Sequence, residues 1–374
     1  MAMSKQVDIV IVGAGFAGLA CAKKAAELGL EVLVIDRKPH AGHSPHTTGI
    51  IVKEALETFP VPSHLLRKVE GIRLYSPGLK HFDLASPGYY FMTTDTPGYL
   101  QYMAELAEKA GASIQFSCDF QTASITDSEV YLENLDISCK YLIGADGARS
   151  KVAQTFGLSS NSSFLLGVEA EYRNVGRLDE NRLHCFLDSE LAKGYIGWVA
   201  PGVNVVQVGV ACRPQYKPAL KPFMDKLSTI FDFSNAELVG HRGGLIPAGG
   251  KLKRLAFDRV LLLGDAAGVV SPLTAGGIYP ALYTGHDLAE VIYQNLNHGG
   301  TAPAECLHTL YPDYVWKAVL RLMLDYAPPN AVLNHVVFHP MFRALAQTVF
   351  FHHKGLFSSA AWKDILFPKT VMGS

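Results

Sequence analysis

This chain has no marked excess of positive or negative charge. Its 374 residues carry 33 Lys and Arg against 34 Asp and Glu, which gives a formal net charge of −1. A protein that binds nucleic acid through the phosphates needs a positive surplus on its surface. We therefore expect no nucleic-acid partner.

Long apolar runs and paired cysteines are also missing. No run of about 18 uncharged apolar residues occurs, so we expect no transmembrane span. The N-terminal segment contains Asp8 and lacks a strongly basic start, unlike a secretory signal. The cysteines are scattered without a C-x-x-C pair, which favours a reducing, cytoplasmic location. They are Cys21, Cys118, Cys139, Cys185, Cys212 and Cys306. The 49 % hydrophobic content leaves peripheral membrane contact open, although a large buried sheet also explains it.

A metal-ligand pattern is absent as well. His335, His339, His352 and His353 have no thiol or acid partners at metal-ligand spacing, so we expect no metal. The stretch 339–354 around them is apolar with cationic residues between. We interpret it as a helix packed on the core, with an interfacial helix as the alternative.

What the chain does have begins with a glycine-rich loop near its N-terminus. The apolar run 7–12 predicts a strand, a helical pattern with small residues follows the loop, and 31–35 predicts a second strand. In this arrangement the first glycine makes a tight turn, the second lets the backbone approach a pyrophosphate, and the third lets helix and strand pack closely. An acid after the second strand is placed to accept from ribose hydroxyls. The predicted cofactor-binding residues here are Gly13, Gly15, Phe16, Ala17, Gly18, Asp36 and Arg37.

A second loop of this kind lies late in the chain. The apolar run 260–263 predicts a buried strand that ends in Gly264 and Asp265, where open α/β sheets bind cofactors. Gly276 and Gly277 follow, and a helix starting at Ile278 would direct its positive dipole end toward an anion-accepting ring. We predict that these five residues contact a cofactor.

A third loop stands between the two in sequence. Tyr141-Leu142-Ile143 predicts a short apolar strand, and Asp146-Gly147 follows it. Together the three loops resemble the flavoprotein superfamily of para-hydroxybenzoate hydroxylase. Within it, the stretch 264–282 (GDAAGVVSPLTAGGIYPAL) is similar to the geranylgeranyl reductase family, as is 193–201 (KGYIGWVAP).

That resemblance implies an α/β fold with one non-covalently bound FAD. It predicts a discontinuous Rossmann-like FAD-binding domain (1–70, 96–160 and 246–300), a β-rich substrate domain (71–95 and 161–245) and a helical C-terminal region (301–374). It also adds Thr48 and Gly49 to the cofactor site, although the family often has Cys-Gly there. Relatives tend to have an arginine where this chain has Thr96.

The implied activity is FAD-dependent reduction of C=C bonds in an isoprenoid or similarly apolar substrate. Tyr195 and Trp198 are the predicted substrate-binding residues, with ordinary sheet packing as the alternative. The chain has no second nucleotide-binding unit, so NADPH, NADH or a reduced partner protein must supply electrons transiently. No catalytic acid, base or nucleophile can be assigned from the sequence.

Three other functions fit parts of the pattern. An FAD-dependent monooxygenase is typical of the wider superfamily. A flavin halogenase would carry Trp-x-Trp-x-Ile-Pro, where this chain has Ile196 for the first Trp and Ala200 for the Ile. A non-catalytic FAD-binding protein is the alternative from a different class.

Overall fold

The computed structural model describes residues 5–126, 128–351 and 358–366. The chain forms two compact units, and each is built from separated segments. Unit 1 comprises Met1–Val61, Asp95–Phe164 and Leu245–Tyr314; unit 2 comprises Pro62–Thr94, Leu165–Gly244 and Val315–Ser374.

Unit 1 is a mixed α/β layer structure. Its elements are β1 (Lys5–Val12), α1 (Phe16–Glu27), β2 (Val32–Asp36), β3 (Ile50–Val52), α2 (Lys53–Thr58), α3 (Thr96–Lys109), β8 (Ser113–Phe116), β9 (Ser124–Ile125), β10 (Val130–Leu132), β11 (Ile137–Gly144), α4 (Lys151–Thr155), β17 (Ala256–Phe257), β18 (Val260–Leu262), the 3-10 turn η2 (Gly264–Ala267), α6 (Ile278–His298) and α7 (Pro303–Leu310).

The central sheet of unit 1 has the order β17-β18-β11-β1-β2-β8. Five neighbouring strands of this sheet are parallel. β1 pairs in parallel with β2 and β11, β11 pairs in parallel with β18, and β2 pairs in parallel with β8. Strands buried on both faces read as continuous apolar runs, and Ile9, Val10 and Ile11 of β1 are fully buried. This confirms the predicted Rossmann-like fold class.

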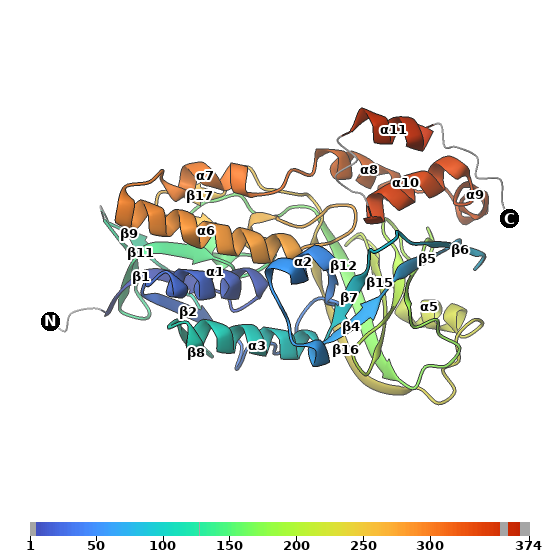
Figure 1. Ribbon diagram of the computed structural model, residues 1–374, viewed down its shortest axis with the longest axis horizontal. Coiled ribbons are helices and arrows are strands. Elements are labelled where there is room, and N and C mark those ends of the chain that lie inside the picture. The colour runs from blue at the N-terminus through green and yellow to red at the C-terminus, as the bar shows by residue number, and fades with distance from the viewer. Residues whose placement is uncertain (1–4, 127, 352–357, 367–374) are drawn as a thin grey trace. The chain divides into compact units, whose positions relative to one another are not determined.

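Three helices, α1, α3 and α6, run side by side along this sheet (Figure 1). Small residues allow α1 and α6 to approach closely. A Cβ atom on Gly285 of α6 would lie only 2.5 Å from the carbonyl oxygen of Ala17 and 3.1 Å from the amide nitrogen of Cys21. Only glycine fits at this crossing, so α6 lies directly on the beginning of α1.

Unit 2 is rich in β-strands and ends in helices. Its elements are η1 (Ser63–Leu65), β4 (Leu66–Val69), β5 (Gly71–Tyr75), β6 (His81–Leu84), β7 (Phe91–Thr94), β12 (Phe164–Arg173), β13 (Arg182–Phe186), β14 (Gly197–Pro201), β15 (Val206–Cys212), α5 (Leu220–Leu227), β16 (Glu237–Pro247), α8 (Val315–Asp325), α9 (Asn330–Val336), α10 (Pro340–Phe351) and α11 (Ser359–Leu366).

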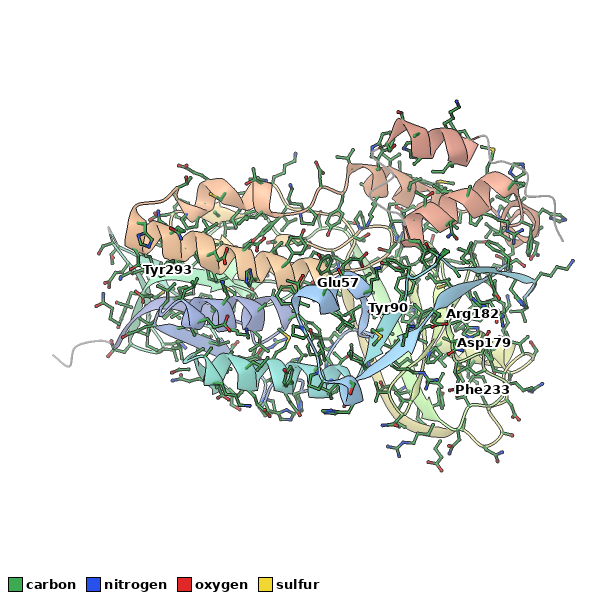
Figure 2. The ribbon with its side chains drawn as sticks, viewed as in Figure 1. Glu57, Tyr90, Asp179, Arg182, Phe233 and Tyr293 are labelled. Carbon is green, nitrogen blue, oxygen red and sulfur yellow. The ribbon has the colours of Figure 1, made fainter. Side chains whose placement is uncertain are left out.

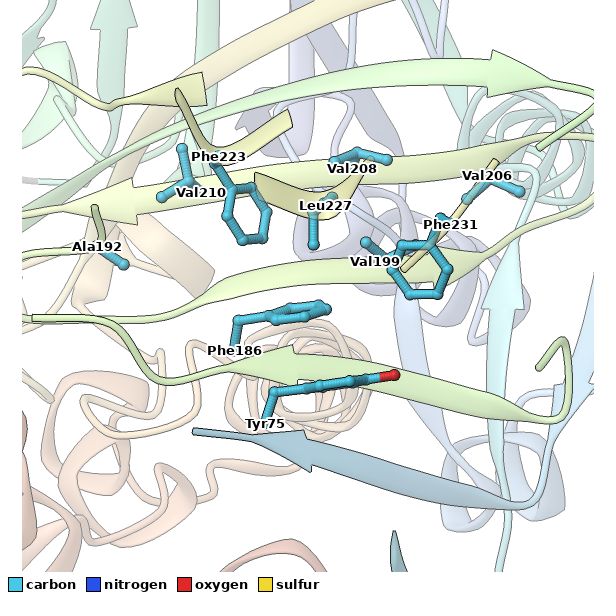
Figure 3. Packing of buried hydrophobic residues seen from close by; sticks show 10 residues of the cluster. All are labelled: Tyr75, Phe186, Ala192, Val199, Val206, Val208, Val210, Phe223, Leu227 and Phe231. Atoms are coloured by element: carbon cyan, nitrogen blue, oxygen red, sulfur yellow. The ribbon is translucent and has the colours of Figure 1, made fainter. Parts of the chain in front are cut away.

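The large sheet of unit 2 has the order β16-β12-β15-β14-β13-β5-β6. Strand β15 pairs antiparallel with β12 on one side and with β14 on the other. One face packs on α5 through a cluster of apolar side chains (Figure 3). Tyr75 and Phe186 stack there with ring centroids 4.3 Å apart, and Phe223 meets Phe186 edge-on at 5.3 Å. Val199 and Val208 complete this face from the two central strands.

Beside this core, a charged cluster ties β5, β6 and β13 together. Arg182 pairs with Asp179 at 3.2 Å and with Asp83 at 3.1 Å, and Arg73 pairs with Asp83 at 2.7 Å. Figure 2 shows Asp179 and Arg182 next to each other. These half-buried pairs fix the edge of the sheet.

The structure draws the domain boundaries differently from the ranges expected above. Residues 62–94 belong to unit 2 because β4 pairs antiparallel with β7, so the predicted boundary at residue 70 lies inside that unit. The helical C-terminal region divides at Tyr314: α7 belongs to unit 1, and α8–α11 belong to unit 2. Within unit 2, Phe351 at the end of α10 packs on Tyr89 and Phe91 with centroid distances of 5.5 and 5.6 Å.

Candidate FAD site

The three predicted loops meet at one edge of the unit 1 sheet. Val12, the last residue of β1, pairs with Ile35 of β2 on one side and with Gly144 of β11 on the other. Gly144 in turn pairs with Leu262 of β18. Because these strands are parallel, the loops after all four strands leave from the same edge. The chain order reverses direction at β1, which is the position where open α/β sheets bind nucleotides.

The three glycines of the first loop differ in what surrounds the position of a Cβ atom. Gly13 has φ of +112°, and a Cβ there would lie 2.3 Å from the carbonyl oxygen of Ala145. A Cβ on Gly18 would lie 2.0 Å from the carbonyl oxygen of Gly13. A Cβ on Gly15 would meet no protein atom within 4 Å. The first and third glycines therefore serve internal packing, whereas Gly15 borders space outside the protein.

The carboxylate of Asp36 binds the first loop itself. Its Oδ2 accepts from the backbone N–H of Ala14 at 2.7 Å, and its Oδ1 accepts from the N–H of Lys38 at 2.8 Å. Each oxygen keeps a further lone pair. Its neighbour Arg37 is exposed.

The Asp146 loop is held by the start of α4. Oδ2 of Asp146 accepts from the N–H groups of Lys151 at 2.6 Å and Val152 at 3.1 Å. Its Oδ1 is buried and has no hydrogen-bond partner among the described residues. A buried carboxylate oxygen without a partner is costly, so this atom needs a donor from outside the protein. Gly147 next to it has φ of +85°, which favours glycine.

The Gly264–Asp265 loop packs directly against the first loop. Gly264 has φ of +61°, and a Cβ there would lie 2.8 Å from the Cβ of Ala17. Burial raises the pKa of the Asp265 carboxyl to about 6. The Asp265 carboxylate also lies near Gly277, because a Cβ built on Gly277 would be 3.6 Å from Oδ1 of Asp265. The structure thus brings the two halves of the late motif together.

Gly277 caps helix α6, which starts at Ile278. No side chain caps this helix terminus, and its first turn holds no acidic residue. Ile278 is buried, while Gly276 is exposed. The N–H groups at the start of the helix can therefore donate hydrogen bonds to a negatively charged ligand edge.

One residue that the sequence patterns missed joins two of the loops. The Nδ2 of Asn161 donates to the carbonyl oxygen of Ala148 at 3.1 Å and to that of Asp265 at 2.8 Å. Asn161 follows the Asp146 loop in sequence but stands in no motif. Because one of its two acceptors, Asp265, lies 104 residues further along the chain, this bridging amide can be recognised only in the folded chain.

Three further predicted cofactor residues are Phe16, Thr48 and Gly49. Phe16 begins α1 and packs on Tyr99 of α3, with ring centroids 5.2 Å apart. Thr48 is half-buried, and Gly49 is buried with φ of +76°. The N–H of Gly49 donates to Oγ1 of Thr47 at 3.3 Å.

This arrangement fits a dinucleotide on three observations. The α1 N-terminus has no side-chain cap and no acid in its first turn. The position of a Gly15 Cβ is free of protein atoms, and Oδ1 of Asp146 lacks a partner in the described chain. A pyrophosphate at the helix N-terminus and a hydroxyl donor at the carboxylate would satisfy these groups.

The predicted substrate residues lie in unit 2. Trp198 on β14 points to the face opposite Val199 and the α5 core, since adjacent residues in a strand alternate. Its Nε1 donates to Oε2 of Glu169 at 2.7 Å, and Arg242 pairs with Oε1 of Glu169 at 3.2 Å. Tyr195 is 8 % exposed, and the guanidinium of Arg321 lies 5.6 Å from its ring centroid.

The described parts of the chain hold no cluster of metal-ligating side chains and no helix that could span a membrane. No group of three or more His, Cys, Asp or Glu side chains there is placed to hold a metal ion. His352 and His353 lie outside the described residues. Among the helices that the structure describes, none is both long and apolar enough to cross a membrane.

Comparison with known proteins identifies the family of this chain. A family model described as "FAD binding domain" matches residues 6–226. The digeranylgeranylglycerophospholipid reductase 2 of Methanosphaera stadtmanae is 29 % identical over 316 residues, covering 79 % of both chains. Two solved structures share the fold. A geranylgeranyl bacteriochlorophyll reductase-like protein from Thermoplasma acidophilum has a TM-score of 0.83 at 20 % identity, covering 98 % of this chain and 97 % of its own. The p-nitrophenol 4-monooxygenase of Pseudomonas putida has a TM-score of 0.71 at 15 % identity, covering 92 % and 98 %. The predicted resemblance to geranylgeranyl reductases is thereby confirmed, and the chain belongs to the family defined by the FAD binding domain.

Proposed function

We propose that this protein is an FAD-dependent reductase that saturates C=C bonds in the isoprenoid chains of a lipid. The set of loops around β1, with its free helix N-termini, supports the cofactor. The reductase relatives and the fold neighbour support the reaction over the hydroxylating members of the superfamily. When bound, reduced FAD would supply a hydride to one alkene carbon, and a nearby acid or ordered water would protonate the other carbon.

Each loop residue has a proposed part in holding FAD. Gly13, Gly15, Phe16, Ala17 and Gly18 form the loop against which the pyrophosphate rests, at the N-terminus of α1. Asp36, with its free lone pairs, accepts from a ribose hydroxyl, and Arg37 borders it. Asp146 and Gly147, with Thr48 and Gly49, line the ribityl and ring side.

The late motif has an electrostatic part in this proposal. Asp265 accepts a ribityl hydroxyl, and the N–H groups at Gly276, Gly277 and Ile278 stabilise negative charge on the ring. The raised pKa of Asp265 supports this arrangement, because a carboxyl that is buried without compensating charge gains from a hydrogen bond to a ligand.

On the substrate side we propose that the indole of Trp198 contacts the apolar chain. Glu169 holds the indole N–H, and Arg242 holds Glu169, so the ring is fixed in place before substrate arrives. For Tyr195, contact with substrate stays a prediction beside a packing role beneath Arg321.

The electron donor belongs to the same proposal. NADPH, NADH or a reduced partner protein reduces the FAD and leaves, since the chain has one G-x-G-x-x-G. A cytoplasmic protein that contacts the membrane peripherally would meet both a soluble donor and a lipid substrate.

The decisive experiment is anaerobic. The purified FAD-loaded chain is reduced chemically and mixed with a detergent-dispersed geranylgeranyl lipid. Reoxidation of the flavin, with a product two hydrogens heavier per bond, supports the reductase. Substrate-stimulated oxygen uptake in air, without anaerobic reoxidation, would instead support a monooxygenase. A chlorinated or brominated product would indicate a halogenase. If no ligand causes either anaerobic reoxidation or oxygen uptake, the chain is a non-catalytic FAD-binding protein.

A further inference from the structure

Helix α8 of unit 2 buries a charged face and exposes an apolar face. Its charged residues, Lys317, Arg321 and Asp325, follow at intervals of four and so lie on one face. That face is turned inward, since Arg321 is only 6 % exposed. The large side chains on the opposite face are all apolar or aromatic, and they are 39–78 % exposed. These are Val315, Trp316, Val319, Leu322, Met323 and Tyr326 just beyond the last turn.

The inward orientation is fixed by specific contacts. The Nη2 of Arg321 donates to the carbonyl oxygen of Gly194 at 2.6 Å and to Oδ1 of Asp325 at 2.7 Å. Arg213 donates to the same carboxylate at 2.8 Å. Rotating the helix to bury its apolar face would break these bonds and leave charges unpaired. These contacts therefore keep the apolar face of α8 on the outside.

The neighbouring helices extend the exposed apolar surface. Val332 and Val336 on α9 are 46 % and 41 % exposed. Of the 14 exposed large hydrophobic side chains in the described chain, ten lie between residues 315 and 366. Figure 1 shows α8–α11 gathered as one group of short helices. A water-facing surface of a globular protein normally reverses this pattern, so a non-aqueous partner must cover it.

The charge of residues 315–374 indicates which kind of partner this surface would bind. Residues 315–374 contain six Lys and Arg but two Asp and no Glu, whereas residues 1–314 contain 27 basic and 32 acidic side chains. Among the side chains that the structure describes between residues 315 and 366, the exposed ionisable ones are His335, His339, Arg343 and Lys363, and none of these four is acidic. An apolar face on a segment with more basic than acidic residues is complementary to an anionic lipid surface. Trp316 and Tyr326 at the two ends of the face are residue types enriched at membrane interfaces.

We propose that the outward face of α8, continued by α9, docks this protein on the surface of an anionic lipid bilayer. The apolar side chains enter the boundary between headgroups and acyl chains, and the basic side chains contact lipid phosphates. Docking of this kind would give an enzyme access to isoprenoid chains, and it deepens the function proposed above. It rests on the helix itself, however, and can be tested without turnover.

The test is co-sedimentation of the full FAD-loaded chain with vesicles. Vesicles of equimolar phosphatidylglycerol and phosphatidylcholine are compared with vesicles of phosphatidylcholine alone. We expect the wild type to bind the anionic vesicles, and to be released as salt is raised. Leu322→Glu should weaken binding about tenfold or more, because a charge replaces an inserted apolar side chain. Leu238→Glu on β16 is the matched control, since Leu238 is 53 % and Leu322 is 54 % exposed. The control should bind like the wild type.

Three results would overturn the proposal: no binding by the wild type, equal binding by Leu322→Glu, or equal loss in both variants. A wild type that is dimeric without lipid and becomes monomeric on Leu322→Glu would assign the face to a second copy instead. FAD content and melting temperature establish that each variant is folded. The anaerobic assay with detergent-dispersed lipid separates the two proposals, because alkene reduction without vesicle binding contradicts docking alone, and vesicle binding without reduction contradicts the reductase alone.

Discussion

The backbone N–H of Ala14 donates a 2.7 Å hydrogen bond to the carboxylate of Asp36, 22 residues further along the chain. The acid that the motif assigns to a ribose therefore also holds the glycine-rich loop against the end of β2. If Asp36 also binds a ribose hydroxyl, as proposed, its removal should affect the cofactor more than the fold.

Asp36→Ala should weaken FAD binding by roughly ten- to a hundredfold, since hydrogen bonds to a charged group contribute about 1.5–3 kcal/mol. Flavin fluorescence titration of the FAD-free protein measures the change. Asp8→Ala is the control, because Asp8 accepts from the N–H of Glu31 at 2.9 Å at the opposite end of the same strand pair. It should lower stability slightly and leave FAD affinity intact. Similar loss of affinity in both variants would contradict a specific role for Asp36.

An added methyl group should impair FAD binding at Gly15 but the stability of the fold at Gly18. Gly15→Ala meets no protein atom, so the FAD-free protein should keep its melting temperature while FAD binding falls strongly. Gly18→Ala places a Cβ 2.0 Å from the carbonyl oxygen of Gly13, so the FAD-free fold itself should be destabilised. Thermal unfolding without FAD, alongside FAD titration, separates the two effects. If Gly15→Ala binds FAD like the wild type, the pyrophosphate does not approach this position.

Trp198 offers a test of substrate contact. Trp198→Phe keeps an aromatic face but loses the bond to Glu169, and Trp198→Ala loses both. If the indole contacts substrate, Trp198→Ala should retain FAD and most of its melting temperature yet lose lipid turnover, with Trp198→Phe intermediate. If the ring belongs to the core, Trp198→Ala should lose about 3–5 kcal/mol of stability. Urea unfolding and turnover, measured on the same preparations, give the answer.

His184 predicts a pH dependence of unit 2. Its Nε2 lies 2.9 Å from the backbone carbonyl of Asp179, which can only accept, so Nε2 carries the proton and Nδ1 accepts from the hydroxyl of Tyr75 at 3.0 Å. Burial lowers the pKa of His184 to about 4, below the ordinary value of about 6.5. The neutral form is thus favoured by folding. Its stabilising contribution is complete above pH of about 6.5 and is lost as the pH falls through about 4.

We expect the free energy of unfolding to fall between pH 7 and pH 4, by up to about 3 kcal/mol from this one group. His184→Gln should be less stable at pH 7 and should show a flatter pH profile. His241→Gln, at an exposed position on β16, should reproduce the wild-type profile. Identical slopes for His184→Gln and the wild type would assign the acid sensitivity to other groups.

The sequence predicts the first strand, its glycine loop and the Asp265 loop well, because continuous apolar runs and glycine spacing are local properties. It does not predict Gly285, whose necessity arises only where α6 crosses α1, or Asn161, whose two acceptors come from distant loops. The boundary near residue 70 was missed because β4 is assigned by its pairing with β7 and not by its own composition. The sequence predicts a helical C-terminal region, but only the contacts of Arg321 and Asp325 reveal which face of α8 is inside.

The close crossing of α1 and α6 at Gly285 also constrains the order of events during synthesis. The chain emerges from the ribosome N-terminus first, so α1 is exposed long before the residues that cover it have been translated. Contacts this distant in sequence form slowly, and the small-residue face of α1 stays open to other chains meanwhile. All the loops of the proposed FAD site are therefore present only after residue 278 has left the ribosome, and chaperones that protect nascent chains have that interval in which to act.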